Sequence, residues 1–143
     1  LNSKKILLVG AGGAARGISL ALGKENVLFL DIINRTEKNA HDLVNLYKNY
    51  CSKNNIKVVN DKNVDYAKYD LVINTTSLGL SENDELPFEL KYFNKNCLVC
   101  DIIMNPSKTK LIKSAISRGL NFHYGRHMLD YQFILMTKFF SII

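Results

Sequence analysis

A glycine-rich turn follows the first short apolar run of the chain. Gly10, Gly12 and Ala15 occupy the three small positions of a G-x-G-x-x-A pattern directly after residues 5–9. The first glycine permits a tight turn, the second lets the backbone approach a pyrophosphate, and the alanine keeps the next helix close to the strand. Free N–H groups at the start of that helix would bind phosphate. The pattern predicts a dinucleotide site, with a purely structural turn as the alternative.

The end of the second apolar run, residues 27–33, carries the residues that distinguish NAD from NADP. An acid there bonds the ribose hydroxyls, whereas a basic residue accommodates the 2′-phosphate. Arg35 can form charge-assisted bonds to a phosphate, and Asn34 and Thr36 add short polar groups. Asp31 is a rival acid, but it lies inside the apolar run, in a register from which it would not reach the ribose. We therefore expect NADP; the alternative is that Arg35 is an ordinary surface arginine.

Short apolar runs alternate with longer amphipathic segments along the whole chain. Strands are expected over residues 5–9, 27–33, 56–59, 70–75, 98–103 and 121–124, and helices over residues 14–23, 37–50, the latter part of 106–118, and 128–143. This alternation predicts a three-layer α/β domain of Rossmann type, with a mostly parallel six-stranded sheet and helices on both faces. Ligands of such sheets bind at the carboxyl ends of the strands, where the motifs fall.

Composition narrows the class of protein further. The 143 residues suit one domain, and no apolar run is long enough to span a membrane. The formal charge is +6, but the lysines are spread along the chain, so we expect no nucleic-acid partner. Cys97 and Cys100 lie three apart in a strand-like run and would point to opposite faces, so they are expected to be small core residues rather than metal ligands or a redox pair. With Cys51 the cysteine count is odd, and we expect no disulfide framework. A reducing cytoplasm fits best.

Five motifs, in order, resemble the C-terminal domain of the shikimate dehydrogenase family. They are G-A-G-G-A-A-R-G at 10–17, N-R-T at 34–36, I-N-T-T-S-L-G-L at 73–80, D-I-I-M-N-P-S-K-T-K-L at 101–111 and G-R-H-M-L-D-Y-Q at 125–132. The first two are shared with other NADP domains, and the last two are more diagnostic. The resemblance implies reversible, NADP-dependent reduction of 3-dehydroshikimate to shikimate in aromatic amino-acid biosynthesis.

The resemblance also implies a set of site residues. The pyrophosphate would be held by Gly10, Ala11, Gly12, Gly13 and Ala14, and the 2′-phosphate by Asn34, Arg35, Thr36, Lys38 and Asn39. The ribose and nicotinamide end would be lined by Thr75, Thr76, Ser77, Leu78, Ile102, Gly125 and Met128, and substrate would touch Gln132 and the position of Met104.

Three positions depart from the family pattern. Asn39 stands where a basic residue is common, which leaves half of the expected phosphate clamp in question, with Lys38 one residue earlier. Met104 replaces a substrate-contacting tyrosine and so removes a hydroxyl. His127 replaces a common glycine beside the expected nicotinamide site, where we expect it to shape the pocket rather than to act as a catalyst.

The resemblance implies a second domain that these residues do not include. In the family, a Lys paired with an Asp donates the proton, and both belong to an N-terminal substrate domain. Because the chain starts at Leu1 and strand-like sequence begins almost at once, we expect a fragment that binds NADP(H) and is catalytically silent alone. The very apolar final helix is expected to cover the missing domain or to make a self-association contact, such as a homodimer.

Alternatives remain open from the sequence. The nearest is the NADP domain of a glutamyl-tRNA reductase, which shares the glycine turn and an N-R-T-like segment but should lack the two diagnostic motifs. A quinate-preferring relative is a closer rival, because Met104 and His127 depart from the family pattern. A non-catalytic NADP-binding module would keep Arg35 and the glycines without ever having had a catalytic domain.

Overall fold

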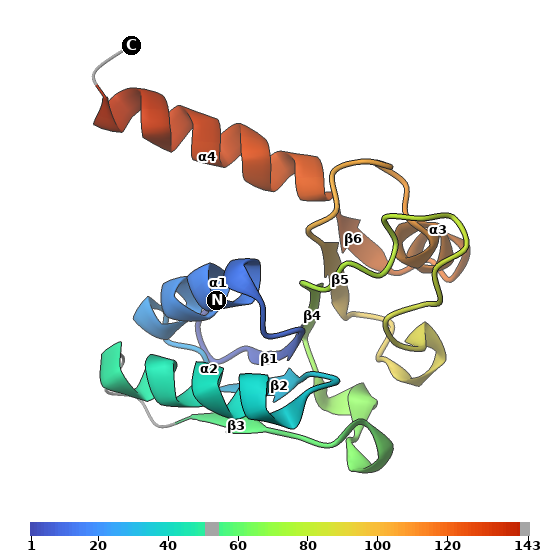
Figure 1. Cartoon of the computed structure of the whole chain (residues 1–143). Helices are drawn as coiled ribbons and strands as arrows, with labels where there is room; N and C mark the ends of the chain where they lie inside the picture. The colour runs from blue at the N-terminus through green and yellow to red at the C-terminus, as the bar shows by residue number, and fades with distance from the viewer. Residues whose placement is uncertain (51–54, 141–143) are drawn as a thin grey trace.

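The computed structural model describes residues 1–50 and 55–140, and these form one sheet flanked by helices (Figure 1). All strand pairs are parallel, and the strand order is β3-β2-β1-β4-β5-β6. The strands are β1 (Lys5–Val9), β2 (Phe29–Ile33), β3 (Ile56–Val58), β4 (Leu71–Asn74), β5 (Leu98–Asp101) and β6 (Asn121–His123). The helices are α1 (Gly13–Lys24), α2 (Glu37–Tyr50), α3 (Lys110–Ser117) and α4 (Gly125–Phe139), with short 3-10 turns η1 (Asp61–Asn63), η2 (Tyr66–Lys68) and η3 (Leu90–Tyr92).

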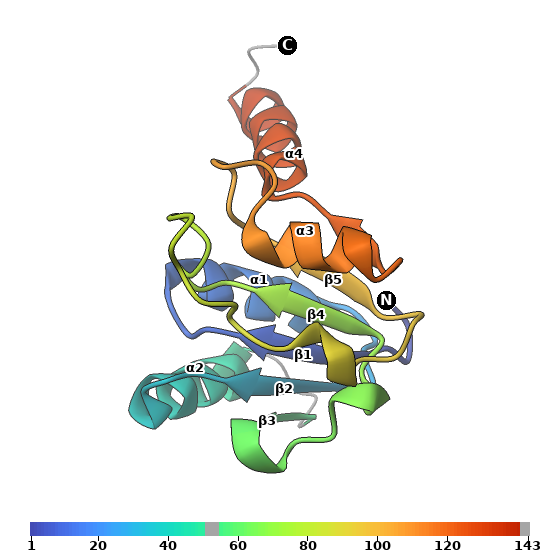
Figure 2. The same ribbon diagram turned by 90° about the vertical axis from the view of Figure 1, so that its right-hand side faces the viewer.

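Alternation along the strands builds a core on each face of the sheet. Ile6 and Leu8 face one core, and Leu7 and Val9 face the other, as expected for side chains of period two. Helices α1 and α2 cover the first face and α3 covers the second, so the sheet is the middle of three layers (Figures 1 and 2). The predicted three-layer Rossmann-type fold is confirmed, and the sheet is fully rather than mostly parallel.

The last helix differs from the prediction at its start. We expected it from residue 128, but α4 begins at Gly125, and no side chain caps it. The sequence therefore carries no capping signal at this point. Both ribbon views show α4 projecting away from the sheet (Figures 1 and 2). Across the described residues, no helix has the length and apolar character that crossing a membrane requires.

The two described cysteines are core residues, as expected. Cys97 belongs to the core under α3, whereas Cys100 packs against the opposite core, so their sulfurs lie on different faces of the sheet. Burial raises the pKa of each thiol to about 12, which keeps both protonated and unreactive. Cys51 lies outside the described residues.

Asp31, which the sequence left unexplained, forms a buried ion pair. Its carboxylate is fully buried in the middle of β2, and its Oδ2 atom accepts hydrogen bonds of 2.8 Å from the Lys68 ammonium and 2.8 Å from the Tyr69 hydroxyl. The Lys68 ammonium also lies 4.9 Å from the centre of the Phe29 ring. Asp31 thus ties η2 to the sheet, and this structural role accounts for an acid inside the strand.

Replacing Lys68 by methionine is expected to destabilise the fold. The change would leave the Asp31 carboxylate buried without its counter-charge, and Asp31 Oδ1 already has no hydrogen-bond partner among the described residues. We expect the free energy of unfolding to fall by about 2–3 kcal/mol, less than for a fully enclosed pair because Lys68 is partly exposed. The matched control is Lys38→Met, which breaks an exposed pair with Asp42 and should cost below about 0.5 kcal/mol. Equal losses for both variants in urea unfolding would contradict this account.

Candidate dinucleotide site

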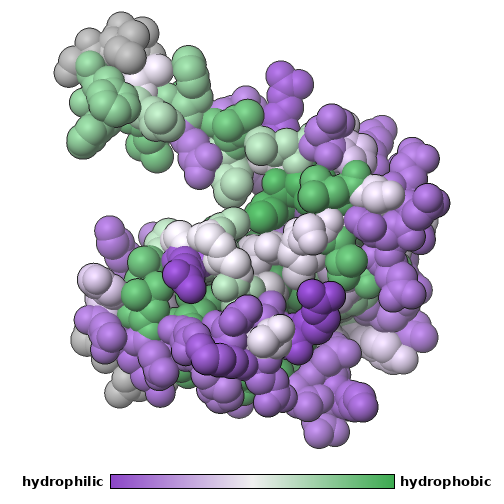
Figure 3. Space-filling view, viewed as in Figure 1, coloured by the Kyte–Doolittle hydropathy of each residue, from purple (hydrophilic) through white to green (hydrophobic). Residues whose placement is uncertain are grey.

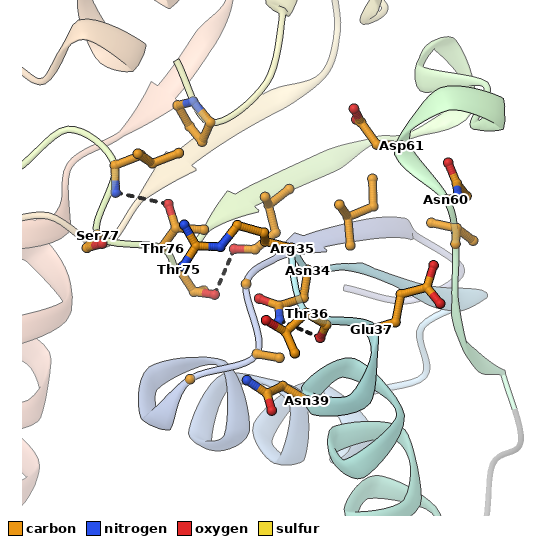
Figure 4. Close-up of a pocket in the computed structure, with 18 of the residues that line it drawn as sticks. Asn34, Arg35, Thr36, Glu37, Asn39, Asn60, Asp61, Thr75, Thr76 and Ser77 are labelled. Atoms are coloured by element: carbon orange, nitrogen blue, oxygen red, sulfur yellow. Dashed lines mark hydrogen bonds between the residues drawn. The ribbon is translucent and has the colours of Figure 1, made fainter. Parts of the chain in front are cut away.

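A pocket lies at the carboxyl ends of the strands, at the point where the strand order reverses between β1 and β4. Its volume is about 690 Å³. Figure 4 shows Asn34, Arg35, Thr36 and Asn39 gathered where β2 gives way to α2, and Thr75–Ser77 at the end of β4. A crevice at this position is where parallel sheets of this order bind ligands. The full lining is Val9, Gly10, Ala11, Gly12, Ile33, Asn34, Arg35, Thr36, Glu37, Asn39, Val59, Asn60, Asp61, Lys62, Thr75, Thr76, Ser77, Leu78 and Pro87.

The glycine turn forms the floor of this pocket, and its two glycines have different roles. Gly10 has φ +114°, and a Cβ on it would lie 3.0 Å from the backbone carbon of Thr75, so no other residue fits there without strain. Thr75 is fixed against the turn because its backbone N–H and its hydroxyl both donate to the Val9 carbonyl at 2.8 Å. Gly12 has an ordinary backbone conformation and open space where a Cβ would stand. The absence of a side chain at Gly12 thus leaves open space for a ligand and is not required for packing within the protein.

The start of α1 supplies donors to the same place. The N-cap residue Gly12 has no side chain to cap the helix, and the first intrahelical bond runs from the Arg16 N–H to the Gly12 carbonyl at 3.1 Å. The amides of Gly13, Ala14 and Ala15 therefore precede the hydrogen-bonding ladder of the helix. Gly13 and Ala14 are not among the lining residues, but they begin the helix at the pocket floor. Such amides and the helix dipole favour an anionic group.

The end of β2 forms a polar turn that leads into α2. The Asn34 amide donates to the Thr36 carbonyl at 2.8 Å, and the Asn39 N–H donates to the same carbonyl at 3.1 Å. Arg35 is exposed on this turn and lines the pocket. Lys38 is not among the lining residues, since its ammonium pairs with Asp42 at 2.9 Å. The structure thus brings together Asn34, Arg35, Thr36 and Asn39 and directs Lys38 elsewhere.

A group of polar residues after β3 was not predicted from the sequence. Asn60, Asp61 and Lys62 line the pocket, and Figure 4 shows Asn60 and Asp61 on the segment that follows β3. The Asn60 side chain accepts a hydrogen bond of 2.9 Å from the Lys62 N–H. Glu37, at the start of α2, also lines it. Ligands of such sheets bind at the carboxyl ends of the strands. Applied to the third strand as well as the second, this rule would have identified these residues.

A buried polar network holds the β4 loop in place. The Asn74 amide donates to the Asp101 carboxylate at 3.1 Å and to the Leu78 carbonyl at 3.2 Å, while its oxygen accepts from the Thr76 hydroxyl at 2.7 Å. Asp101 also accepts from the Thr109 hydroxyl at 2.7 Å. Burial raises the pKa of Asp101, and the hydrogen bonds that it accepts oppose this shift. This network joins the ends of β4 and β5 and fixes the shape of residues 75–78.

The remaining predicted residues lie outside this pocket, on the β5 and β6 side of the switch point. Gly125 packs so closely that a Cβ would come within 2.5 Å of the Ile102 carbonyl, which joins the start of α4 to the end of β5. Met128 follows in the first turn of α4. Met104 is exposed in the loop after β5, and Gln132 is exposed on α4. None of these residues lines the pocket that contains Arg35.

The chemistry of the lining suits an elongated anionic ligand. Backbone amides at α1 and the exposed guanidinium of Arg35 offer donors at separate points, while Leu78 and Pro87 add apolar surface. The described residues contain no group of three or more His, Cys, Asp or Glu side chains placed to hold a metal ion. What these side chains can do is bind and orient a ligand, and the donors fit the phosphates of a dinucleotide.

A parallel sheet in this strand order, with a glycine turn at its switch point, defines the class of Rossmann-type dinucleotide-binding domains. Residues 1–102 match the family model "Shikimate / quinate 5-dehydrogenase". The chain belongs to the shikimate/quinate dehydrogenase family, which confirms the resemblance seen in its motifs. This assignment replaces the glutamyl-tRNA reductase alternative.

Individual relatives agree with the family assignment. The chain is 34% identical over 145 residues to the shikimate dehydrogenase (NADP(+)) of Methanosphaera stadtmanae, covering 99% of this chain and 51% of that protein. It is 38% identical over 133 residues to the corresponding enzyme of Geobacillus sp. (strain WCH70), covering 92% and 48%. A crystal structure of a shikimate dehydrogenase in complex with NADP+ superposes with a TM-score of 0.90 at 28% identity, covering 100% of this chain and 50% of that one. The chain therefore spans about half the length of these relatives.

Proposed function

We propose that this chain is the NADP-binding domain of a shikimate dehydrogenase. The observation that carries the proposal is the position of Arg35, exposed on the polar turn after β2 and lining the same pocket as the glycine turn. Position 34 holds an amide, where an acid would select NAD by bonding the ribose hydroxyls. The NADP+ in the related crystal structure supports this choice, as do the NADP(+)-dependent names of the relatives.

The proposed reaction is the reversible reduction of 3-dehydroshikimate to shikimate. NADPH, when bound, supplies a hydride to the ketone carbon, and the alkoxide that forms takes a proton from an acid. The residues of this chain bind and orient the cofactor: the amides of Gly13 and Ala14 hold the pyrophosphate, Arg35 holds the 2′-phosphate, and Thr75 to Leu78 shape the path toward the second nucleoside. The resemblance assigns the proton donor to a Lys–Asp pair in the substrate half of the family's chain.

The exposed surface of α4 supports a contact with that substrate half. Seven large side chains of this helix are at least 44% exposed: Leu129, Tyr131, Phe133, Ile134, Leu135, Met136 and Phe139. Figure 3 shows mostly hydrophobic surface over the projecting helix. An apolar surface of this extent is normally covered by another protein surface. The relatives are about twice as long as this chain, so a substrate domain is the occupant that we propose.

Two residues are proposed substrate contacts, and they bear on the second candidate function. Gln132 on α4 would hydrogen-bond a substrate hydroxyl, and Met104 would stand where the family commonly has a tyrosine. Met104 offers no hydroxyl to a substrate. We therefore expect residues of the substrate half to decide between shikimate and the related quinate. A quinate-preferring enzyme is therefore the second candidate, and the family model that matches this chain covers both activities.

The test is to measure cofactor binding and turnover on the same preparation. We expect the 143-residue chain to bind NADPH and to form no NADPH from shikimate and NADP+. Turnover at the rates of ordinary dehydrogenases, on the order of 10 per second, would overturn the proposal that the chain alone is catalytically silent. Failure to bind NADPH would overturn the proposed cofactor site.

A further inference from the structure

Two histidines meet at the carboxyl end of β6. The Nε2 atom of His123, the last residue of the strand, lies 3.3 Å from the Nδ1 atom of His127 in the first turn of α4. The rings are nearly perpendicular, with their centres 4.5 Å apart, and the Tyr124 ring lies 6.0 Å from the ring of His127. His127 is exposed, and His123 is half-buried beneath it. The half-buried imidazole of His123 therefore supports the exposed imidazole of His127.

The two histidines lie on the β5 and β6 side of the switch point, outside the pocket that contains Arg35. A dinucleotide in this fold crosses the switch point, with one nucleoside over each half of the sheet. The candidate phosphate residues of the pocket lie at the ends of β1 and β2, so the second nucleoside would lie over the ends of β4, β5 and β6. His123 pairs with Cys100 of β5, and the start of α4 packs on Ile102 at the end of the same strand. Both histidines thus border the nicotinamide end.

The contact between the rings limits how many protons the pair can carry. A hydrogen bond between two imidazole nitrogens needs one N–H donor and one lone pair. One added proton leaves that bond intact, whereas a second removes the acceptor and places two positive charges side by side. Histidine side chains as a class change charge between about pH 5 and pH 8. The other titratable groups on the adjoining segments are Asp101, Lys108, Tyr124, Arg126, Asp130 and Tyr131.

We propose that His127, supported by His123, makes this domain discriminate between the oxidised and the reduced cofactor. The inference rests on the proposed function and concerns the same site. The nicotinamide ring is positively charged in NADP+ and neutral in NADPH, so a protonated imidazole at its edge disfavours only the oxidised form. Two like charges about 4 Å apart that remain fully solvated change an affinity by roughly fivefold.

The experiment compares the dissociation constants of the chain for NADP+ and NADPH at about pH 8 and about pH 6, where imidazoles titrate. We expect the ratio of the NADP+ constant to the NADPH constant to rise roughly fivefold on acidification. The ratio is informative because both forms carry the same 2′-phosphate, whose own protonation cancels. His127→Gly should make the ratio independent of pH, which separates the imidazole from Asp101. His41→Gln, on α2, removes the third histidine of the chain and should keep the full change.

A third ligand separates this inference from the proposed function. The compound 2′,5′-ADP contains the phosphorylated adenosine but no nicotinamide, so its binding tests the Arg35 side alone. If 2′,5′-ADP binds and the NADP+ to NADPH ratio is the same at both pH values, or the change persists in His127→Gly, the role of the histidine pair is overturned while the cofactor site stands. If 2′,5′-ADP does not bind, the proposed function itself fails. The titrations include a chelator so that a metal held by the two imidazoles cannot produce the effect.

Discussion

Alanine at Gly12 should abolish tight cofactor binding and leave the fold intact, whereas alanine at Gly10 should damage the fold itself. At Gly12 the backbone conformation suits any residue and the new methyl group would meet no protein atom, so it occupies only the space expected for the pyrophosphate. We expect NADPH affinity to fall roughly 5- to 150-fold, corresponding to the roughly 1–3 kcal/mol of an overpacked contact. At Gly10 the positive φ and the collision with Thr75 should together lower the free energy of unfolding by about 3 kcal/mol.

Gly17→Ala is the matched control for both variants. Gly17 lies on the exposed side of α1, and a Cβ there also meets no atom. Alanine favours a helix interior over glycine by about 0.5–1 kcal/mol, so this variant should be slightly more stable and should bind NADPH normally. Thermal unfolding and NADPH titration of the three variants provide the comparison. Normal NADPH binding by Gly12→Ala would mean that the glycine turn is a structural feature and not a phosphate site.

Arg35→Ala should remove most of the preference for NADPH over NADH. The guanidinium is exposed on the turn after β2, where charge-assisted hydrogen bonds to a phosphate are worth roughly 1.5–3 kcal/mol. We therefore expect NADPH affinity to fall roughly 10- to 100-fold and NADH affinity to change little, because NADH has no 2′-phosphate. The fall should shrink at high salt, since the interaction is between charges at the surface.

Arg118→Ala provides the control for lost net charge. Arg118 is an exposed arginine that ends α3, on the opposite face of the sheet from α2, and its removal lowers the charge of the chain by the same amount. NADPH affinity should be unchanged in this variant. An equal loss in the Arg35 and Arg118 variants would show that the overall basic charge, rather than a phosphate site at β2, attracts the nucleotide.

The glycine turn and the parallel sheet were predictable because local rules determine them. A strand, a G-x-G-x-x-A turn and a helix at the right spacing leave little choice of geometry, and alternating elements lead to a parallel sheet. The strict alternation of Ile6, Leu7, Leu8 and Val9 between the two cores follows from the two-residue period of a strand. These features need no knowledge of contacts between distant residues.

Contacts between residues far apart in sequence were not predictable from the chain alone. The register of Asp31 excluded it as a ribose ligand, but the reason for an acid inside an apolar strand appeared only with its partner, Lys68, 37 residues away. Asn60, Asp61 and Lys62 belong to the pocket only because β3 lies beside β2 in the sheet. The Lys38 ammonium pairs with Asp42, which is close in sequence. The sequence is equally compatible with a Lys38 side chain that points toward the pocket.

The end of the chain shows a second limit. The start of α4 at Gly125 is set by close packing against Ile102, which no capping residue announces. That start brings His127 over His123, so the sequence showed an isolated histidine where the structure has a pair. The apolar character of α4 was evident from composition, whereas its exposure in this domain depends on the overall arrangement of the elements.

The most direct test of the account is a side-by-side titration of the chain with NADPH and NADH by calorimetry. The account predicts saturable binding of NADPH and binding of NADH that is weaker by roughly 10- to 100-fold, the value of one set of charge-assisted bonds to a phosphate. Equal affinity for the two nucleotides, or tighter binding of NADH, would contradict the assignment of the Arg35 turn as a 2′-phosphate site. Binding of neither would contradict the claim that these 143 residues form a working cofactor domain.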